Sequence, residues 1–197
     1  VLFAYLSLPF VRWAGPLVWL YHLYRDRIFG HQGNMLTANA FNLWALIFGI
    51  DFSRNDLTLF FGLNLRVWGQ ILFGLSLLPV LTTLLFKKAD PKITLWSLAI
   101  VSLASFVFLT NMHERYLSPL FPYLTILIFL FPKLKVLYFF SSLIFCFNLY
   151  HLWYVPDISW LRAVYQPVTI KLFSIVHLIL AFWLELSFFR FLRPKKL

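Results

Sequence analysis

The densest group of residues that could do chemistry lies in the segment Thr110–Pro119. His113, Glu114 and Arg115 follow one another there and supply a base, an acid and a permanent cation. Arginine presents a planar fork of donors that suits phosphate oxygens, and histidine adds a second donor. Asn111 is four residues before Arg115, so we expect the two to share a helix face, with Glu114 pointing elsewhere. The segment predicts a site for a phosphate-bearing lipid headgroup, and the alternative is a charged helix end beside a membrane interface.

A second segment, Thr37–Leu46, alternates amide and aromatic side chains. Amides hydrogen-bond hydroxyl groups in both senses, and aromatic faces stack on sugar rings, so this composition suits a saccharide or a lipid-linked saccharide. We therefore expect Asn39, Asn42 and Trp44 to line a groove for a lipid or an acceptor. The alternative is a short interfacial helix anchored by Phe41 and Trp44, with Asn39 as its N-cap.

The composition places both segments in a membrane protein. Of 197 residues, 61% are hydrophobic and only 12% are charged, with a mean hydropathy of +0.81. A soluble domain of this size cannot bury that much apolar surface, which excludes a soluble enzyme, a disordered chain and a disulfide scaffold. The formal net charge of +10 comes from short basic clusters between apolar runs, so we expect membrane lipids as partners and no nucleic acid.

Apolar runs of roughly 20 residues, the length needed to cross a membrane, recur along the chain. The third run is short and should borrow a turn from the segment before it, and Val1–Phe10 is expected to be the end of a further helix. The sequence therefore predicts an all-α, multi-pass transmembrane helix bundle with five full spans and a partial one. The five spans are Leu63–Phe86, Ile93–Met112, Leu117–Phe131, Val136–Tyr154 and Val168–Phe189.

The basic clusters predict the orientation of these spans. Short connections that are rich in Lys and Arg face the cytoplasm, which places the carboxyl terminus inside a plasma (inner) membrane. Both candidate segments then lie outside. Thr37–Leu46 lies within an outer loop over residues 12–59 that is also expected to hold two short interfacial helices, around Leu17–Tyr24 and Asn42–Phe48. The whole chain, 1–197, is expected to be a single transmembrane domain. The basic clusters are Lys87, Lys88 and Lys92, then Lys133 and Lys135, and finally Arg190, Arg193, Lys195 and Lys196.

Polar residues inside the predicted spans receive lesser roles. Gln70 and His177 are expected to face the bundle interior and to hydrogen-bond across helices. Asn148 and His151 lie near the outer end of their span, where they could border the same cavity as His113. The histidines show no recognisable zinc-binding spacing, so no metal site is predicted from them.

The two candidate segments together resemble motifs of a known family. Asn39-Ala40-Phe41-Asn42-Leu43-Trp44-Ala45-Leu46 and Met112-His113-Glu114-Arg115-Tyr116-Leu117, in this order, are similar to segments of the bacterial GT-C integral-membrane glycosyltransferases. The similarity is closest to the mannosyltransferase-like branch that takes sugars from polyprenyl- or dolichyl-phosphate carriers, and Leu8-Pro9-Phe10 also fits that branch. The resemblance covers most of the chain as the carboxyl-terminal part of such an enzyme.

This resemblance implies a GT-C-like fold and the transfer of one sugar, by hexosyl or mannosyl transfer, from a polyprenyl-phosphate donor to a lipid, glycan or protein acceptor. It makes His113 and Arg115 the donor-phosphate ligands, and gives Glu114 and Asn111 orienting or sugar-binding roles. The catalytic carboxylate is expected upstream of this chain, which alone should be inactive, and a divalent metal ion could assist. Asp26, Asp51 and Asp56 are accordingly expected to be solvated loop residues or caps.

Two other functions fit the same residues. A transporter or flippase for lipid-linked saccharides would use the same basic and aromatic outer groove without any chemistry. Such a protein should show inverted repeats or broken helices in matched positions, and the sequence contains neither pattern. A non-catalytic membrane protein is the third alternative.

Overall fold

The computed structural model describes residues 16–22, 25, 34–87 and 90–193. The chain divides into two compact units, residues 1–34 and 35–197. In the first unit, helix α2 covers Pro16–His22, within the stretch around Leu17–Tyr24 for which a helix is predicted. The partial helix predicted for Val1–Phe10 and the residue Asp26 lie outside the described residues. The single transmembrane domain over 1–197 stays a prediction.

Four long apolar helices make up most of the second unit. They are α4 (Leu65–Phe86), α5 (Pro91–Phe108), α7 (Lys135–Trp153, preceded by the short helix η4, Pro132–Leu134) and α9 (Pro167–Leu192). Each is long and apolar enough to cross a bilayer. This confirms the prediction of a helical, membrane-embedded protein.

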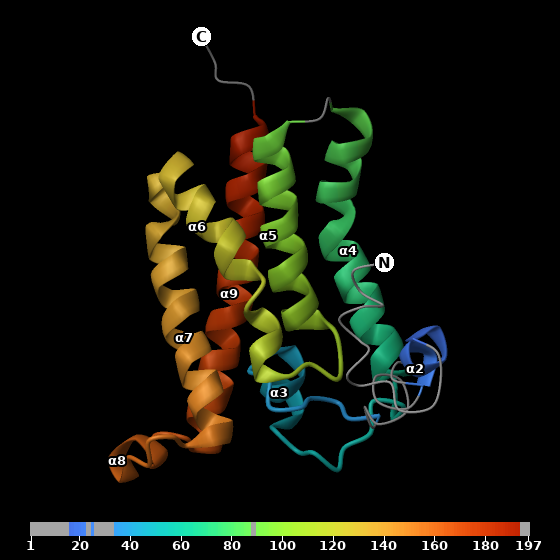
Figure 1. Ribbon diagram of the computed structural model, residues 1–197, viewed down its shortest axis with the longest axis vertical. Helices are drawn as coiled ribbons and strands as arrows, with labels where there is room; N and C mark the ends of the chain where they lie inside the picture. Colours follow the sequence, from blue (N-terminus) through green and yellow to red (C-terminus); the bar gives the residue numbers. More distant parts are fainter. Residues whose placement is uncertain (1–15, 23–24, 26–33, 88–89, 194–197) are drawn as a thin grey trace. The chain divides into compact units, whose positions relative to one another are not determined.

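The third predicted span has a different form. It consists of a single turn, η3 (Glu114–Leu117), followed by α6 (Leu120–Leu130), a helix of 11 residues that is only about 16 Å long. Four helices rather than five therefore have the length of a full span in the described part of the chain. The combined run still leads from the end of the bundle that carries α3 to the opposite end, so the chain direction alternates as predicted (Figure 1).

The predicted basic clusters meet at one end of this bundle. Lys87 Nζ donates a hydrogen bond of 3.4 Å to the carbonyl of Leu192, which joins the ends of α4 and α9. Lys133, Arg190 and Arg193 line one cavity at the same end. We call this the basic end and the opposite one, which carries α3, the site end (Figure 1). The side of the membrane that each end faces stays a prediction.

Helix α3 (Leu43–Phe48) packs into the site end instead of lying in the lipid interface. Trp44 and Ala45 are buried, and the helix contacts α9 and α5. The predicted helix therefore exists, but its apolar face covers protein, because the ends of the long helices offer it a larger apolar surface than the interface would. The prediction that it lies along the leaflet is wrong for this helix.

A small β-hairpin precedes the first long helix. Strands β1 (Leu59–Phe60) and β2 (Leu63–Asn64) pair in antiparallel register around Phe61 and Gly62, which both have positive φ (48° and 81°). Two residues in this conformation form a type I′ turn, which matches the twist of a hairpin and favours glycine. Asn64 then caps α4 by accepting a 2.8 Å hydrogen bond from the amide of Val67. Helix α4 consequently begins two residues later than predicted.

Candidate functional site

The two segments that the sequence singles out are joined by backbone hydrogen bonds at the site end. The amide of Asn111 donates to the carbonyl of Leu36 at 3.1 Å, and the amide of Ala38 donates to Met112 at 3.0 Å. Ala38 and Asn39 also form isolated β-bridges with His113. Residues about 70 positions apart in the sequence therefore lie side by side, as a shared site requires.

This pairing ends α5 earlier than the sequence predicts. The helix stops at Phe108, and Leu109 is extended (φ −72°, ψ 151°), which frees the next residues to pair with Leu36 and Ala38. Asn111 has φ +58°, a left-handed conformation that asparagine tolerates better than most residues. The prediction that Asn111 and Arg115 share a helix face is therefore wrong, because the chain between them is not α-helical.

Glu114 is the buried centre of the candidate site. Its side chain is 0% exposed, and neither carboxylate oxygen has a hydrogen-bond partner among the described residues. The nearest basic groups are His113 Nδ1, 4.0 Å from Oε2, and Arg115 Nη1, 3.8 Å from Oε1. The tight turn η3 causes this arrangement, because it directs consecutive side chains to different sides. Glu114 thus points inward while Arg115, at 57% exposed, points outward.

His113 lies between these two environments. Its side chain is 24% exposed and its ring meets the ring of Tyr116 edge to face at 5.1 Å. Partial burial lowers the pKa of His113 and the neighbouring Arg115 lowers it further, while Glu114 acts in the opposite direction. The imidazole is therefore neutral at pH 7, and an additional anion beside it would favour the protonated form.

A buried carboxylate, Asp56, holds the segment between α5 and η3 in front of this site. Asp56 is 1% exposed and binds Arg66 through two hydrogen bonds of 2.9 Å, one to each carboxylate oxygen. The hydroxyl of Thr110 donates a further 2.8 Å hydrogen bond to Asp56. The prediction of a solvated loop residue is wrong for Asp56, because the β-hairpin brings Arg66 back to it. Asp51 does behave as predicted: it caps a turn by accepting hydrogen bonds from Ser53, which lower its pKa.

Asn42 and Trp44 have structural contacts at the end of α5. Asn42, not Asn39 as predicted, is the N-cap of α3 and accepts hydrogen bonds of 3.1 Å from the amides of Trp44 and Ala45. The indole of Trp44 donates to the carbonyl of Phe108 at 2.8 Å. Both side chains are buried, so in this structure they fix α3 to α5, which favours the locally anchored helix over a groove-lining role.

Asn39 is enclosed by polar side chains from two long helices. It exchanges hydrogen bonds with Asn148 and contacts Nδ1 of His151, both on α7. His177 of α9 is buried, as predicted, but its Nδ1 donates to the carbonyl of Phe41 at 2.7 Å, in the loop before α3, and not to another helix. Asn148 and His177 thus hydrogen-bond the backbone carbonyls of the buried loop that holds Asn39 and Phe41. Asn39 also forms an isolated β-bridge with His113, so it links Asn148 and His151 to the candidate site. Gln70, in contrast, is exposed on α4, so its predicted interior position is wrong.

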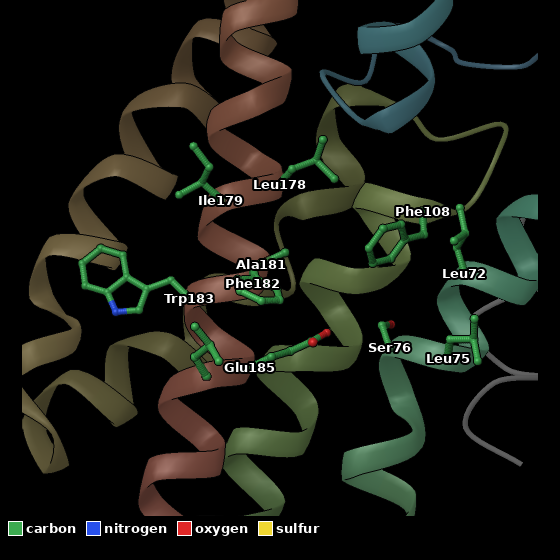
Figure 2. Close-up of a pocket in the computed structure, with 11 residues that line it drawn as sticks. Leu72, Leu75, Ser76, Phe108, Leu178, Ile179, Ala181, Phe182, Trp183 and Glu185 are labelled. Atoms are coloured by element: carbon green, nitrogen blue, oxygen red, sulfur yellow. The ribbon is translucent and has the colours of Figure 1, made fainter.

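A large apolar groove runs between α4 and α9. Its volume is about 720 Å³, and Phe108 of α5 lines its part nearest the site end. Figure 2 shows the side chain of Glu185 extending from α9 toward Ser76 of α4 across this groove. A carboxylate within an apolar helix of membrane-spanning length is rare and usually functional. This groove was not predictable from local sequence patterns, because its walls come from helices separated by about 100 residues.

Metal-binding geometry is absent from the described part of the chain. No group of three or more His, Cys, Asp or Glu side chains lies close enough there to hold an ion. At the candidate site, Asp56 is already paired with Arg66. Glu114 is then the one carboxylate left nearby among the described residues. The described residues alone therefore do not form a metal centre.

Comparisons of the chain with protein-family models, with curated proteins and with solved structures gave no match.

Proposed function

We propose that the protein is a membrane glycosyltransferase, of the kind the two motifs resemble, that takes a sugar from a polyprenyl-phosphate donor. The observation that carries the proposal is the buried, hydrogen-bond-free carboxylate of Glu114 between the imidazole of His113 and the exposed guanidinium of Arg115. Ionisable groups are costly to place close to membrane depth and usually serve a polar ligand. A buried carboxylate beside a histidine and an arginine at the end of a membrane bundle fits a site for a ligand with a phosphate.

The chemistry of the reaction assigns roles to these residues. In sugar transfer the bond between the anomeric carbon and the phosphate oxygen breaks, and the acceptor hydroxyl forms the new bond to that carbon while its proton passes to a base. Negative charge develops on the departing phosphate. Arg115 and His113 stabilise that charge by hydrogen bonds, and Glu114 is a positioning residue for both. We assign the base to no described residue, since Asp56 is held by Arg66.

The groove between α4 and α9 supports a lipid-linked substrate. It is apolar apart from Glu185 and Ser76, and its volume suits a hydrocarbon chain. Phe108, which lines it, also accepts the hydrogen bond of Trp44, so the groove begins beside the buried loop of the candidate site. An isoprenoid tail in this groove would leave its phosphate at the site end.

The test measures the transfer of radiolabelled hexose from polyprenyl-phosphate donors in membranes that contain the full-length protein. Transfer of label to a lipid, glycan or protein acceptor is expected for the wild type, and His113→Ala and Arg115→Ala should abolish it while membrane insertion stays intact. Arg162→Ala is the matched control. Arg162 belongs to the short helix α8 (Ser159–Arg162), which lies at the site end (Figure 1), and it is a similarly exposed arginine (54%) that pairs with Asp157. Normal transfer by both site variants would contradict the assignment, and donor binding without transfer in the wild type would favour a transporter.

A further inference from the structure

The basic end contains a second cavity that the proposed reaction does not use. It has a volume of about 550 Å³ and lies between η4, the start of α5 and the end of α9. Its polar lining includes three cations, Lys133, Arg190 and Arg193, and its apolar lining includes the rings of Trp96 and Trp183. We call this cavity the basic pocket.

The cations of the basic pocket have no anionic partner among the residues that the structure describes. None of the ion pairs in the described residues includes Lys133, Arg190 or Arg193. The nearest acidic residue along α9, Glu185, lines the other groove, and Asp90 caps α5 through the amide of Lys92. Arg190 is on the last turn of α9 and Arg193 is the extended residue that follows the helix, and both line the basic pocket.

A buried donor at the same place also has no partner. Trp96 is 1% exposed and lines the basic pocket, and its indole Nε1 has no hydrogen-bond partner among the described residues. A buried N–H group without an acceptor is uncommon and calls for a ligand or water. The pocket thus combines an unused donor with three unpaired cations, and every one of these groups favours an oxygen-rich anion.

We propose that the basic pocket binds the headgroup of an acidic phospholipid from the leaflet beside the basic end. Pockets of this kind, with basic side chains between transmembrane helices, suit the phosphates of anionic lipids. The two tryptophans favour a lipid over a free phosphate ion, because indole rings prefer the headgroup and glycerol level of a bilayer. The volume also exceeds what a phosphate ion alone requires and suits a phosphate with its glycerol.

The test uses the whole chain, purified in detergent, with native mass spectrometry to count bound lipids. Dioleoylphosphatidylglycerol is the acidic probe, and dioleoylphosphatidylcholine is the neutral one with the same acyl chains. The wild type should retain one phosphatidylglycerol preferentially, and Arg190→Gln with Arg193→Gln should weaken this binding about 30-fold, the loss expected for two cations near a membrane surface. Trp96→Phe keeps the ring but removes the N–H, and should weaken binding several-fold.

A double variant, Lys92→Gln with Lys135→Gln, is the matched control. It removes two exposed cations from the same end without altering the lining of the basic pocket, so it should bind phosphatidylglycerol like the wild type. Equal losses in both double variants would overturn the proposal, because the effect would then be general charge. Equal binding of phosphatidylcholine, displacement of the lipid by millimolar inorganic phosphate, or unchanged binding by Trp96→Phe would also overturn it. Arg115→Ala should leave this binding unchanged, which separates it from the donor site.

Discussion

A carboxylate without hydrogen bonds is costly to bury, and Glu114 is such a group. Its two basic neighbours, Arg115 at 3.8 Å and His113 at 4.0 Å, are too far for hydrogen bonds, so they offset only part of the cost of removing the charge from water. A structural carboxylate would be expected to bind backbone amides or an arginine closely, as Asp56 does with Arg66. The arrangement of Glu114 is therefore more typical of a site than of a structural contact.

Opposite changes in the pKa of His113 should result when its two charged neighbours are removed. Glu114→Gln removes a nearby negative charge, so the pKa should fall further below its ordinary value. Arg115→Gln removes a positive charge, so the pKa should rise. NMR titration of ¹³C-labelled histidine in micelles measures both changes. An unchanged pKa in both variants would mean that burial alone sets it.

Donor affinity should depend on pH through the same histidine. A sugar phosphodiester keeps its single charge between pH 5 and 8, and this charge beside His113 would raise the imidazole pKa. Binding then takes up a proton, so affinity should rise as pH falls from 8 toward the lowered pKa of the free protein, by about tenfold per unit of pKa difference. His113→Gln should bind more weakly and without this pH dependence. A pH-dependent affinity in that variant would assign the effect to another group.

At the scale of elements, the linker between α5 and η3 depends on the Asp56–Thr110 hydrogen bond. Thr110→Val preserves the side-chain shape but removes the 2.8 Å hydrogen bond to a buried carboxylate, and should lower the free energy of unfolding by about 1–3 kcal/mol. Thr110→Ser keeps the hydroxyl and should cost less. Thermal unfolding in detergent compares the two. Equal stability of both variants would show that the hydrogen bond does not hold the linker.

The contact between α4 and α5 depends on a glycine. A Cβ at Gly69 would lie 2.7 Å from the carbonyl oxygen of Phe108 and 3.4 Å from the ring of Trp44. Gly69→Ala should therefore separate the helices and lower the melting temperature. Gly74→Ala on the same helix meets nothing within 4 Å, and should be neutral or stabilising by up to about 1 kcal/mol. A stabilising Gly69→Ala would mean that the two helices do not approach this closely.

The long helices were predictable from the sequence, because apolar runs of membrane length have few alternatives. The ends of these helices were not. Helix α5 gives up its last turn to backbone pairing with residues about 70 positions away, and no local pattern signals such a contact. For the same reason the burial of Asp56 was missed, since its partner Arg66 returns through a hairpin whose one local signal is the Phe61-Gly62 turn.

Within the candidate site, the sequence identified the residues that carry charge but not their surroundings. His113, Glu114 and Arg115 do lie together, because they are consecutive. The burial of Asn39 and Asn42 depends on Asn148, Phe106 and other groups from distant helices, which composition cannot reveal.

At the scale of the whole molecule, the two ends of the second unit differ in character. The basic end carries Lys133, Arg190 and Arg193, which form no ion pair among the described residues. The site end holds the two hydrogen-bonded segments around Ala38 and Met112 and the buried Glu114. The positive-inside rule predicts that the basic end faces the cytoplasm. In a Cys146→Ser background, a cysteine at Ser53 should react with an impermeant maleimide added outside, and one at Lys92 should react only after permeabilisation. The reverse pattern would place the candidate site on the cytoplasmic side.

The most direct test of the central claim is the dissociation constant of a polyprenyl-phosphate hexose for the wild type, Arg115→Gln and Arg162→Gln in lipid nanodiscs. If Arg115 holds the donor phosphate, its replacement should weaken binding by about 10- to 100-fold, the loss expected for a hydrogen bond to a charged group. Arg162→Gln should stay within about twofold of the wild type, as surface charges of this kind contribute little. Binding by Arg115→Gln that equals that of the wild type would contradict the account.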